Sequence, residues 1–271
     1  MPRTQECVAF SAEGLDWFLL NASPEIRRQI EDFAPLHPRS PRHSPIQAIL
    51  LTNGDLDHCL GLLSLRESHP LTVYATASVR RGFTEDNVLY RTLERFEGQV
   101  TWRELPLGRE QALDCGRGSG ALTVEAIAVP GKAPVHLERS RPSAPEDNVA
   151  LRIRDTTSGR SLAYASAVGR LTPAVRAALA GADCVLFDGT FWSDDELIAG
   201  GLGTQHAEEM AHVPVGGPGG SLETLRDLPA ARKVYIHVNN TNPLLREDSP
   251  ERAMAEAAGW QVAWDGMEID L

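Results

Sequence analysis

One segment, Ala48-Ile-Leu-Leu-Thr-Asn-Gly-Asp-Leu-Asp-His58, constrains the fold of this chain more than any other. It begins within a short apolar run, Ile46–Leu51, of the kind expected for a buried strand. The run ends abruptly in a loop that carries Asp55, Asp57 and His58, and a helix is expected beyond it. Ligand sites in α/β proteins form where strands end. We therefore expect at least one of these polar side chains to face a cleft.

Two other predicted strands end in the same way. The strand Cys184–Phe187 runs into Asp188, and the strand Lys233–His237 ends in a histidine. His212, just before a glycine-rich turn, is a further candidate. The asparagines that follow the last of these strands are Asn239, Asn240 and Asn242. Three polar strand ends in one chain favour a functional site.

Each of these features also has a purely structural explanation. Asp57 could be a helix N-cap, because Asp is favoured there. Asp188-Gly189 could be only a turn, and His212 could be a partly buried residue without a chemical role. The asparagines could simply satisfy their own backbone. The sequence leaves these alternatives open for each residue taken alone.

The order of predicted elements indicates an α/β fold. Strands come first, and strands then alternate with helices, which predicts two mixed β-sheets packed face to face with helices on the outer faces. A helix capped by Ser23 is expected over Ile26–Phe33, and a helical region from Ala77 to Phe96. No clean linker divides the 271 residues, so we expect a single domain over 1–271.

Composition narrows the class of partner. The formal net charge of −11 argues against nucleic acid, which needs a basic face. No apolar run approaches the roughly 18 residues of a membrane span, and the start of the chain lacks the pattern of a signal peptide. We therefore expect a cytoplasmic protein without a membrane partner. The cysteines are scattered and are expected to be reduced thiols; they are Cys7, Cys59, Cys115 and Cys184.

The stretch Thr52-Asn-Gly-Asp-Leu-Asp-His58, followed by Gly61-Leu-Leu, resembles the metal-binding signature of the metallo-β-lactamase superfamily. The likeness is closer still to the pyrroloquinoline quinone (PQQ) biosynthesis protein B family. The segments that carry it extend from Leu20 to Glu268 and include Leu20–Arg27, Val129–Lys132, Phe187–Trp192, Gly216–Ser221, Ile236–Pro243 and Gly266–Glu268. The resemblance implies a metallo-β-lactamase-like αββα sandwich and a role in PQQ biosynthesis.

The sequence departs from the hydrolases of that superfamily at two places. Their signature is H-x-H-x-D-H, whereas Asn53 and Asp55 stand at the first two histidine positions here. The acid that bridges two metals would fall near Ala165-Ser-Ala167, where this chain has none. A binuclear hydrolase is therefore not expected. The metal ligands that remain are Asp57, His58 and His237.

Two histidines and one carboxylate are the ligand set of mononuclear non-haem Fe(II) oxygenases. Zinc would accept the same ligands, so ligand type alone leaves the metal open. The family looks like an iron-dependent hydroxylase that acts on a tyrosine-derived precursor of the quinone, which favours Fe(II) and O₂. By resemblance, Asp188 and His212 are expected to act catalytically beside the metal, as a proton-handling pair or by orienting substrate. By analogy, Lys132 and the three asparagines (Asn239, Asn240 and Asn242) are expected to contact substrate.

Two other functions remain open: a zinc-dependent hydrolase, and a non-catalytic protein that binds or carries PQQ. The expected partners are a small-molecule or modified-peptide substrate, other proteins of the pathway and a second copy of the chain in a homodimer. Members of the family normally begin with a glycine-rich strand-turn and a cysteine cluster that resembles a structural zinc site. This sequence begins at the next strand, and Cys7 belongs to no such cluster. We therefore expect the first strand and that structural zinc to be missing.

Overall fold

The computed structural model describes residues 3–65, 70–114 and 121–271. The chain forms two compact units, each built from segments that are separated in sequence. Unit 1 comprises Met1–Ala126, Ala133–Asp147 and Asp155–Thr157, and unit 2 comprises Ile127–Lys132, Asn148–Arg154 and Ser158–Leu271. The single domain over 1–271 stays a prediction.

Unit 1 contains a five-stranded mixed sheet. Its strands, in spatial order, are β1 (Val8–Phe10), β2 (Trp17–Leu20), β3 (Ile46–Leu50), β4 (Leu71–Ala75) and β5 (Val100–Glu104). The first pair is antiparallel, and the other neighbours are parallel. Strand β3, which leads into the motif loop, is almost entirely buried, as is usual for a parallel strand covered on both faces.

The helices of unit 1 are shorter than the sequence predicted. They are α1 (Ile26–Asp32), η1 (Ala34–Leu36), α2 (Leu56–Cys59), η2 (Leu60–Leu65), α3 (Ala77–Thr84) and η3 (Val88–Glu94). Strands β6 (Gln111–Ala112) and β7 (Leu122–Ala128) pair in antiparallel fashion. Ser23 does not cap α1, because its hydroxyl donates to Gln29 and the N-cap residue is Glu25. The long helical region breaks at Asn87, whose side chain caps η3 instead.

Unit 2 contains strands β8 (Val149–Asp155), β9 (Ser161–Ala165), β10 (Cys184–Asp188), β11 (Arg232–Ile236) and β12 (Trp260–Val262), in that spatial order. The first two are antiparallel and the rest are parallel. Carboxyl ends of parallel strands meet at one edge of a sheet. Asp188 is paired with Ile236, so the ends of β10 and β11 lie next to each other.

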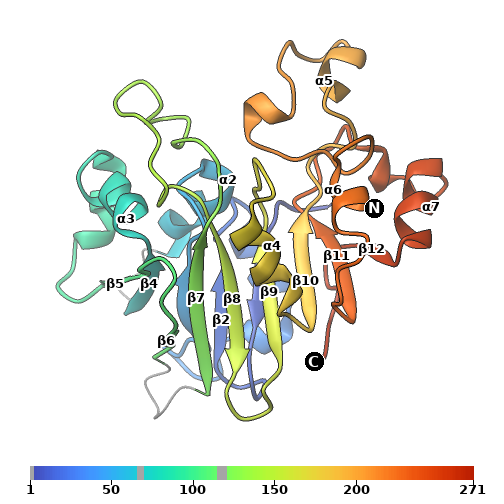
Figure 1. Ribbon diagram of the computed structural model, residues 1–271. Helices are drawn as coiled ribbons and strands as arrows, with labels where there is room; N and C mark the ends of the chain where they lie inside the picture. Colours follow the sequence, from blue (N-terminus) through green and yellow to red (C-terminus); the bar gives the residue numbers. More distant parts are fainter. Residues whose placement is uncertain (1–2, 66–69, 115–120) are drawn as a thin grey trace. The chain divides into compact units, whose positions relative to one another are not determined.

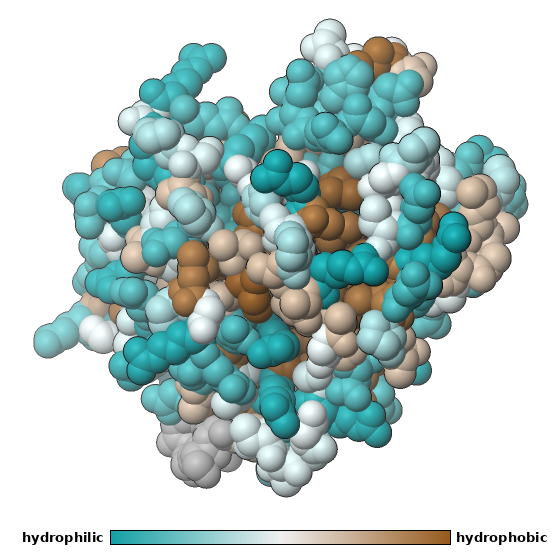
Figure 2. Space-filling model, viewed as in Figure 1, coloured by the Kyte–Doolittle hydropathy of each residue, from teal (hydrophilic) through white to brown (hydrophobic). Residues whose placement is uncertain are grey.

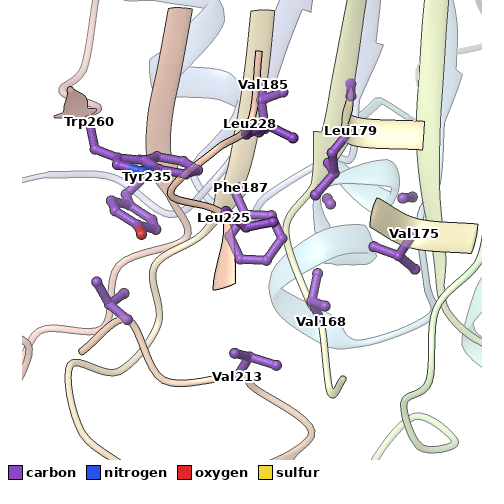
Figure 3. Close-up of a cluster of buried hydrophobic side chains, with 14 of the residues drawn as sticks. Val168, Val175, Leu179, Val185, Phe187, Val213, Leu225, Leu228, Tyr235 and Trp260 are labelled. Carbon is purple, nitrogen blue, oxygen red and sulfur yellow. The ribbon is translucent and has the colours of Figure 1, made fainter. Parts of the chain in front are cut away.

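The helices of unit 2 are α4 (Pro173–Ala180), α5 (Glu196–Ala199), η4 (Glu208–Met210), α6 (Ser221–Thr224), η5 (Pro243–Leu245) and α7 (Pro250–Ala257). Helix α4 lies against β9 and β10 (Figure 1) and contributes Val175 and Leu179 to a core that also contains Phe187. Figure 3 shows this core, in which the rings of Tyr235 and Trp260 stack with centroids 4.2 Å apart. Because side chains alternate along a strand, Asp188 points to the face opposite Phe187.

Figure 2 shows hydrophilic side chains over most of one face, with smaller hydrophobic patches between them. Among the described residues, no helix combines the length and the apolar character needed to cross a bilayer. Cys7, Cys59 and Cys184 are free thiols, as predicted, and Cys115 lies outside the described residues.

Candidate metal centre

In unit 1 the motif loop follows β3 and leads into α2. Asp55 is the N-cap residue of α2, whereas Asp57 and His58 lie within the helix. The explanation of Asp57 as a helix N-cap is therefore wrong. Its side chain is 39% exposed and that of His58 only 2%, and Asp57 Oδ2 lies 3.5 Å from His58 Nε2. The structure leaves Asp57 accessible enough to bind a ligand.

Asn53 and Asp55 shape this loop. Asn53 Oδ1 accepts a hydrogen bond from the Asp55 backbone N–H at 3.0 Å, and Asp55 Oδ1 accepts one from the Val135 N–H at 3.2 Å. Gly54 packs so closely on Pro134 that a Cβ atom there would lie 2.9 Å from the proline Cγ. The two positions that carry histidines in the hydrolases thus fold the loop and tie it to the segment at Val135.

His58 is held by the side chain of Asn21. The Thr52 backbone N–H donates to Asn21 Oδ1 at 2.9 Å, which fixes the orientation of the amide. Asn21 Nδ2 therefore donates to His58 Nδ1, 2.8 Å away. Asn21 has a left-handed backbone with φ 63°, which asparagine tolerates better than most residues. Neutral His58 in this network carries its proton on Nε2. No role was predicted for Asn21 from the sequence, although it follows β2 directly.

In unit 2 the carboxylate of Asp188 has no exposed surface and is the centre of a hydrogen-bond network. Its Oδ1 accepts from the backbone N–H of Thr190 at 3.0 Å and from the Thr190 hydroxyl at 2.6 Å. Its Oδ2 accepts from the Val168 N–H at 2.8 Å and from His212 Nδ1 at 2.7 Å. Four hydrogen bonds fill the acceptor capacity of a carboxylate. Asp188 therefore acts through the groups that it holds.

Electrostatics keep Asp188 ionised. Burial by itself would raise the pKa of this carboxyl group. The charges of His212 and His237 and the hydrogen bonds from His212 and Thr190 outweigh burial, so the pKa lies below its ordinary value. A buried carboxylate that stays ionised is an acceptor only, and it orients every donor around it.

His237 follows β11 in a left-handed conformation, with φ 53°. Its Nδ1 lies 2.7 Å from the Thr190 hydroxyl oxygen, and its ring stacks on that of His212 with centroids 5.5 Å apart. Asp188, His212 and His237 each offer a ligand atom, and these atoms lie within 4.8 Å of one another. Strained backbone of this kind is often found at functional sites. Unit 2 thus brings together three of the predicted site residues.

The residues predicted to contact substrate differ in their surroundings. Asn242 is buried, and its amide donates to the carbonyls of Gly189 and Thr190 at 2.8 and 3.3 Å while its Oδ1 accepts from the Leu244 N–H. It therefore has the structural role that the sequence left open as an alternative for these asparagines. Asn239 is half-buried and donates to Thr241, Asn240 is exposed, and Lys132 is half-buried. Their contacts with substrate stay predictions.

Ser166 is a residue that the sequence analysis missed. It directly follows β9, at the position where the superfamily hydrolases have the acid that bridges two metals. Its side chain is only 1% exposed. Within the described part of the chain its hydroxyl has no hydrogen-bond partner. Strand alternation puts it on the same face as Asp188, since Ala165 pairs with Phe187. The sequence could have pointed to Ser166 only because it is a polar residue that follows a strand. Serine is so common in loops that this position alone does not single it out.

The predicted ligands come from both units. Asp57 and His58 belong to unit 1 and His237 to unit 2, so the three-residue ligand set stays a prediction. Cys59, which follows the motif, is not suited to join it. Burial raises the pKa of its thiol to about 12, and a metal binds the thiolate.

The family model and the most similar relatives that were found point to the same protein family. Residues 16–238 match the model of the beta-lactamase superfamily domain. Two proteins described as coenzyme PQQ synthesis protein B, from Methylobacterium radiotolerans and Azotobacter vinelandii, are each 44% identical to this chain, and the alignments cover 100% of it and 88% of each relative.

Solved structures agree. The crystal structure of Zn²⁺-bound PqqB from Methylobacterium extorquens superposes with a TM-score of 0.92 at 42% identity, over 100% of this chain and 89% of that one. A diphosphatase of the PhnP family matches with a TM-score of 0.66 at 18% identity, over 99% and 85% of the two chains, which is a likeness of fold alone. The predicted metallo-β-lactamase fold, with two mixed sheets and helices, is confirmed.

Proposed function

Because the chain belongs to the coenzyme PQQ synthesis protein B family and has a role in PQQ synthesis, we propose that it is a metal-dependent hydroxylase of a tyrosine-derived intermediate in that synthesis. The observation that carries the proposal is the buried Asp188 carboxylate with two imidazoles arranged around it. Such a cluster at the ends of parallel strands is expected of a catalytic site.

We propose Asp57, His58 and His237 as the metal ligands. The donor set suits the metal, since two imidazoles and one carboxylate leave coordination positions open for other ligands. The Nδ1 of His237 is engaged by Thr190, which leaves Nε2 as its coordinating nitrogen. His58 carries its proton on Nε2 in the Asn21 network, so metal binding through that atom would require the proton to leave or to move to Nδ1. When bound, Fe(II) would supply the one-electron chemistry that O₂ requires.

His212 is the residue proposed to accept a proton. Its Nδ1 faces the Asp188 carboxylate at 2.7 Å, so the proton of the neutral ring is on Nδ1 and the lone pair is on Nε2. The side chain is 14% exposed, and the edge contact with Phe191 limits the orientation of the ring. An imidazole backed by a buried carboxylate is a general base of the kind found in hydrolytic triads.

Metal analysis of protein purified without oxygen tests the proposal. We expect iron at about one atom per chain from three ligands, and His237→Ala and Asp57→Ala should each lose most of it. His206→Ala is the matched control, because His206 is exposed and its Nδ1 is engaged by Asp194, which is not a proposed ligand. Full iron in the His237→Ala protein would exclude the proposed ligand set.

A zinc-dependent hydrolase is the second candidate, and the observation that favours it is the Zn²⁺ in the crystal structure of the Methylobacterium extorquens relative. The same purification separates the candidates. Zinc at about one atom per chain, with hydrolysis that does not consume O₂, would favour the hydrolase. Neither metal would favour a protein that binds or carries PQQ.

A further inference from the structure

We propose that Thr190 is a positioning residue that transmits the orientation set by Asp188 to His237 and fixes the Nδ1–H tautomer of that histidine. The inference rests on the proposed function only where it concerns metal binding. Its structural part concerns three side chains of unit 2 alone.

The Thr190 hydroxyl oxygen lies within hydrogen-bond distance of three groups. Asp188 Oδ1 is 2.6 Å away, His237 Nδ1 is 2.7 Å away and the His237 carbonyl oxygen is 2.9 Å away. A hydroxyl has one proton to donate and two lone pairs with which to accept. Only one assignment of protons satisfies the two shortest contacts together.

In that assignment the Thr190 hydroxyl donates to Asp188 Oδ1 and accepts from His237 Nδ1–H. If the hydroxyl donated to His237 instead, its lone pair would face the carboxylate at 2.6 Å, which is repulsive. Hydrogen bonds to a charged acceptor are also the stronger ones. The lone pair of neutral His237 must then be on Nε2, the atom that a metal or a proton would bind.

Neighbouring residues hold Thr190 in place. The Asn242 amide donates to the carbonyls of Gly189 and Thr190, and the Asn239 N–H donates to the Thr190 carbonyl at 3.1 Å. The Gly189 N–H donates to the Ile236 carbonyl at 2.8 Å, next to His237. The turn that carries Thr190 is thus tied to both sides of the His237 loop.

The Asp188 carboxylate therefore orients both imidazole rings, one by a direct hydrogen bond and the other through the Thr190 hydroxyl. Asp188 Oδ2 binds His212 Nδ1 directly, and Asp188 Oδ1 reaches His237 Nδ1 through the Thr190 hydroxyl. Removing the hydroxyl should free His237 and leave His212 unchanged. This selectivity separates a positioning role from a general structural one.

The test uses metal-free protein labelled with ¹⁵N at histidine, at a pH where both rings are neutral. Long-range ¹H–¹⁵N spectra assign the tautomer of each ring. We expect His237 to be Nδ1–H in the parent protein, to become a mixture of tautomers in Thr190→Val, and to return to Nδ1–H in Thr190→Ser. His212 should remain Nδ1–H in all three. A His237 that stays Nδ1–H in Thr190→Val overturns the proposal.

Zinc titration separates this inference from the proposed metal site. Loss of a partner behind a metal-binding histidine weakens affinity about 10–100-fold, so we expect that loss in Thr190→Val and not in Thr190→Ser. A shifted tautomer with unchanged zinc affinity would uphold the role of Thr190 and exclude His237 as a ligand. If Thr190→Val does not fold, Thr190→Ala gives the same readout, since it removes the same hydroxyl.

Discussion

Each unit contains a buried carboxylate with several hydrogen bonds, and the two differ in the partner that carries positive charge. In unit 1, Asp147 is 1% exposed and forms two hydrogen bonds with the Arg141 guanidinium, at 2.9 and 2.6 Å. Ser78 and the Ala144 N–H complete its surroundings, both at 2.7 Å. In unit 2, Asp188 has two histidines in place of an arginine.

The comparison separates a structural ion pair from a candidate catalytic one. Arginine is always charged, so Arg141 neutralises Asp147 permanently and fixes the loop that also contacts the motif through Val135. Histidine is neutral over much of the physiological range, so the charge of Asp188 stays available to orient imidazoles and to attract a cation. The pKa of each carboxyl is lowered although burial opposes this.

The largest expected effect on stability is that of Asp147→Asn. Removing one partner of a buried ion pair costs about 3–5 kcal/mol, because it leaves the other charge uncompensated. Arg141 would remain 16% exposed with its Nε already lacking a partner among the described residues. Urea denaturation measures the loss, and zinc affinity should not change. Glu146→Gln, one residue away, is the control; an equal loss there would contradict a special role for the Asp147–Arg141 pair.

For Asp188→Asn we expect a clear loss of zinc affinity and a smaller loss of stability than for Asp147→Asn. We expect zinc affinity to fall about 10–100-fold, as for other residues that support a metal-binding histidine. The free energy of unfolding should fall by about 1–3 kcal/mol, because the new amide N–H₂ must face a group that itself donates. Titration with zinc measures the affinity, and urea denaturation measures the free energy of unfolding. If Asp188→Asn lost stability but bound zinc normally, both buried carboxylates would be structural.

The sequence predicted the position of the unit 2 network better than it predicted which residues complete it. A strand followed by Asp or His was the signal for Asp188 and His237, and the structure places these residues at neighbouring strand ends, whereas the role of Asp57 stays a prediction. Thr190 was not predicted, since Asp-Gly-Thr is also a common turn, and its backbone N–H does form the local bond to Asp188 that such a turn requires.

Other parts of the site depend on contacts between distant residues. Asn21 and His58 are 37 positions apart, and no local pattern pairs them. Asn53 was not expected to bind a metal, and its bond to the Asp55 N–H could not be read from residue types. The helical region from Ala77 to Phe96 was predicted too long, because Asn87 interrupts the periodic pattern and caps the next turn.

Acid titration of stability should reveal the ion pair of unit 1. The pKa of Asp147 is held below its ordinary value of 3.8, mainly by Arg141 acting against burial. A lowered folded-state pKa adds stability that is fully present above the unfolded-state value and is lost as the pH falls through the folded one. We expect the unfolding free energy to decline below pH 3.8 in the parent protein and to decline less in Asp147→Asn. Equal slopes would show that the pair does not contribute.

The smallest expected effect is that of Ser166→Ala, on the same face as Asp188. A buried hydroxyl without a partner costs about 1 kcal/mol or more in desolvation, so replacing it with a methyl group should leave stability unchanged or raise it slightly. Ser221 is the matched control: it is equally buried, but its hydroxyl is 3.0 Å from that of Tyr235, so Ser221→Ala should lose about 1 kcal/mol. Thermal and urea unfolding of the two variants give the comparison. If Ser166→Ala lost as much as Ser221→Ala, the Ser166 hydroxyl would belong to the framework of unit 2, as Asp147 belongs to that of unit 1. If it lost nothing, the buried hydroxyl would be a polar group that the fold does not need, on the face where Asp188 orients its two histidines.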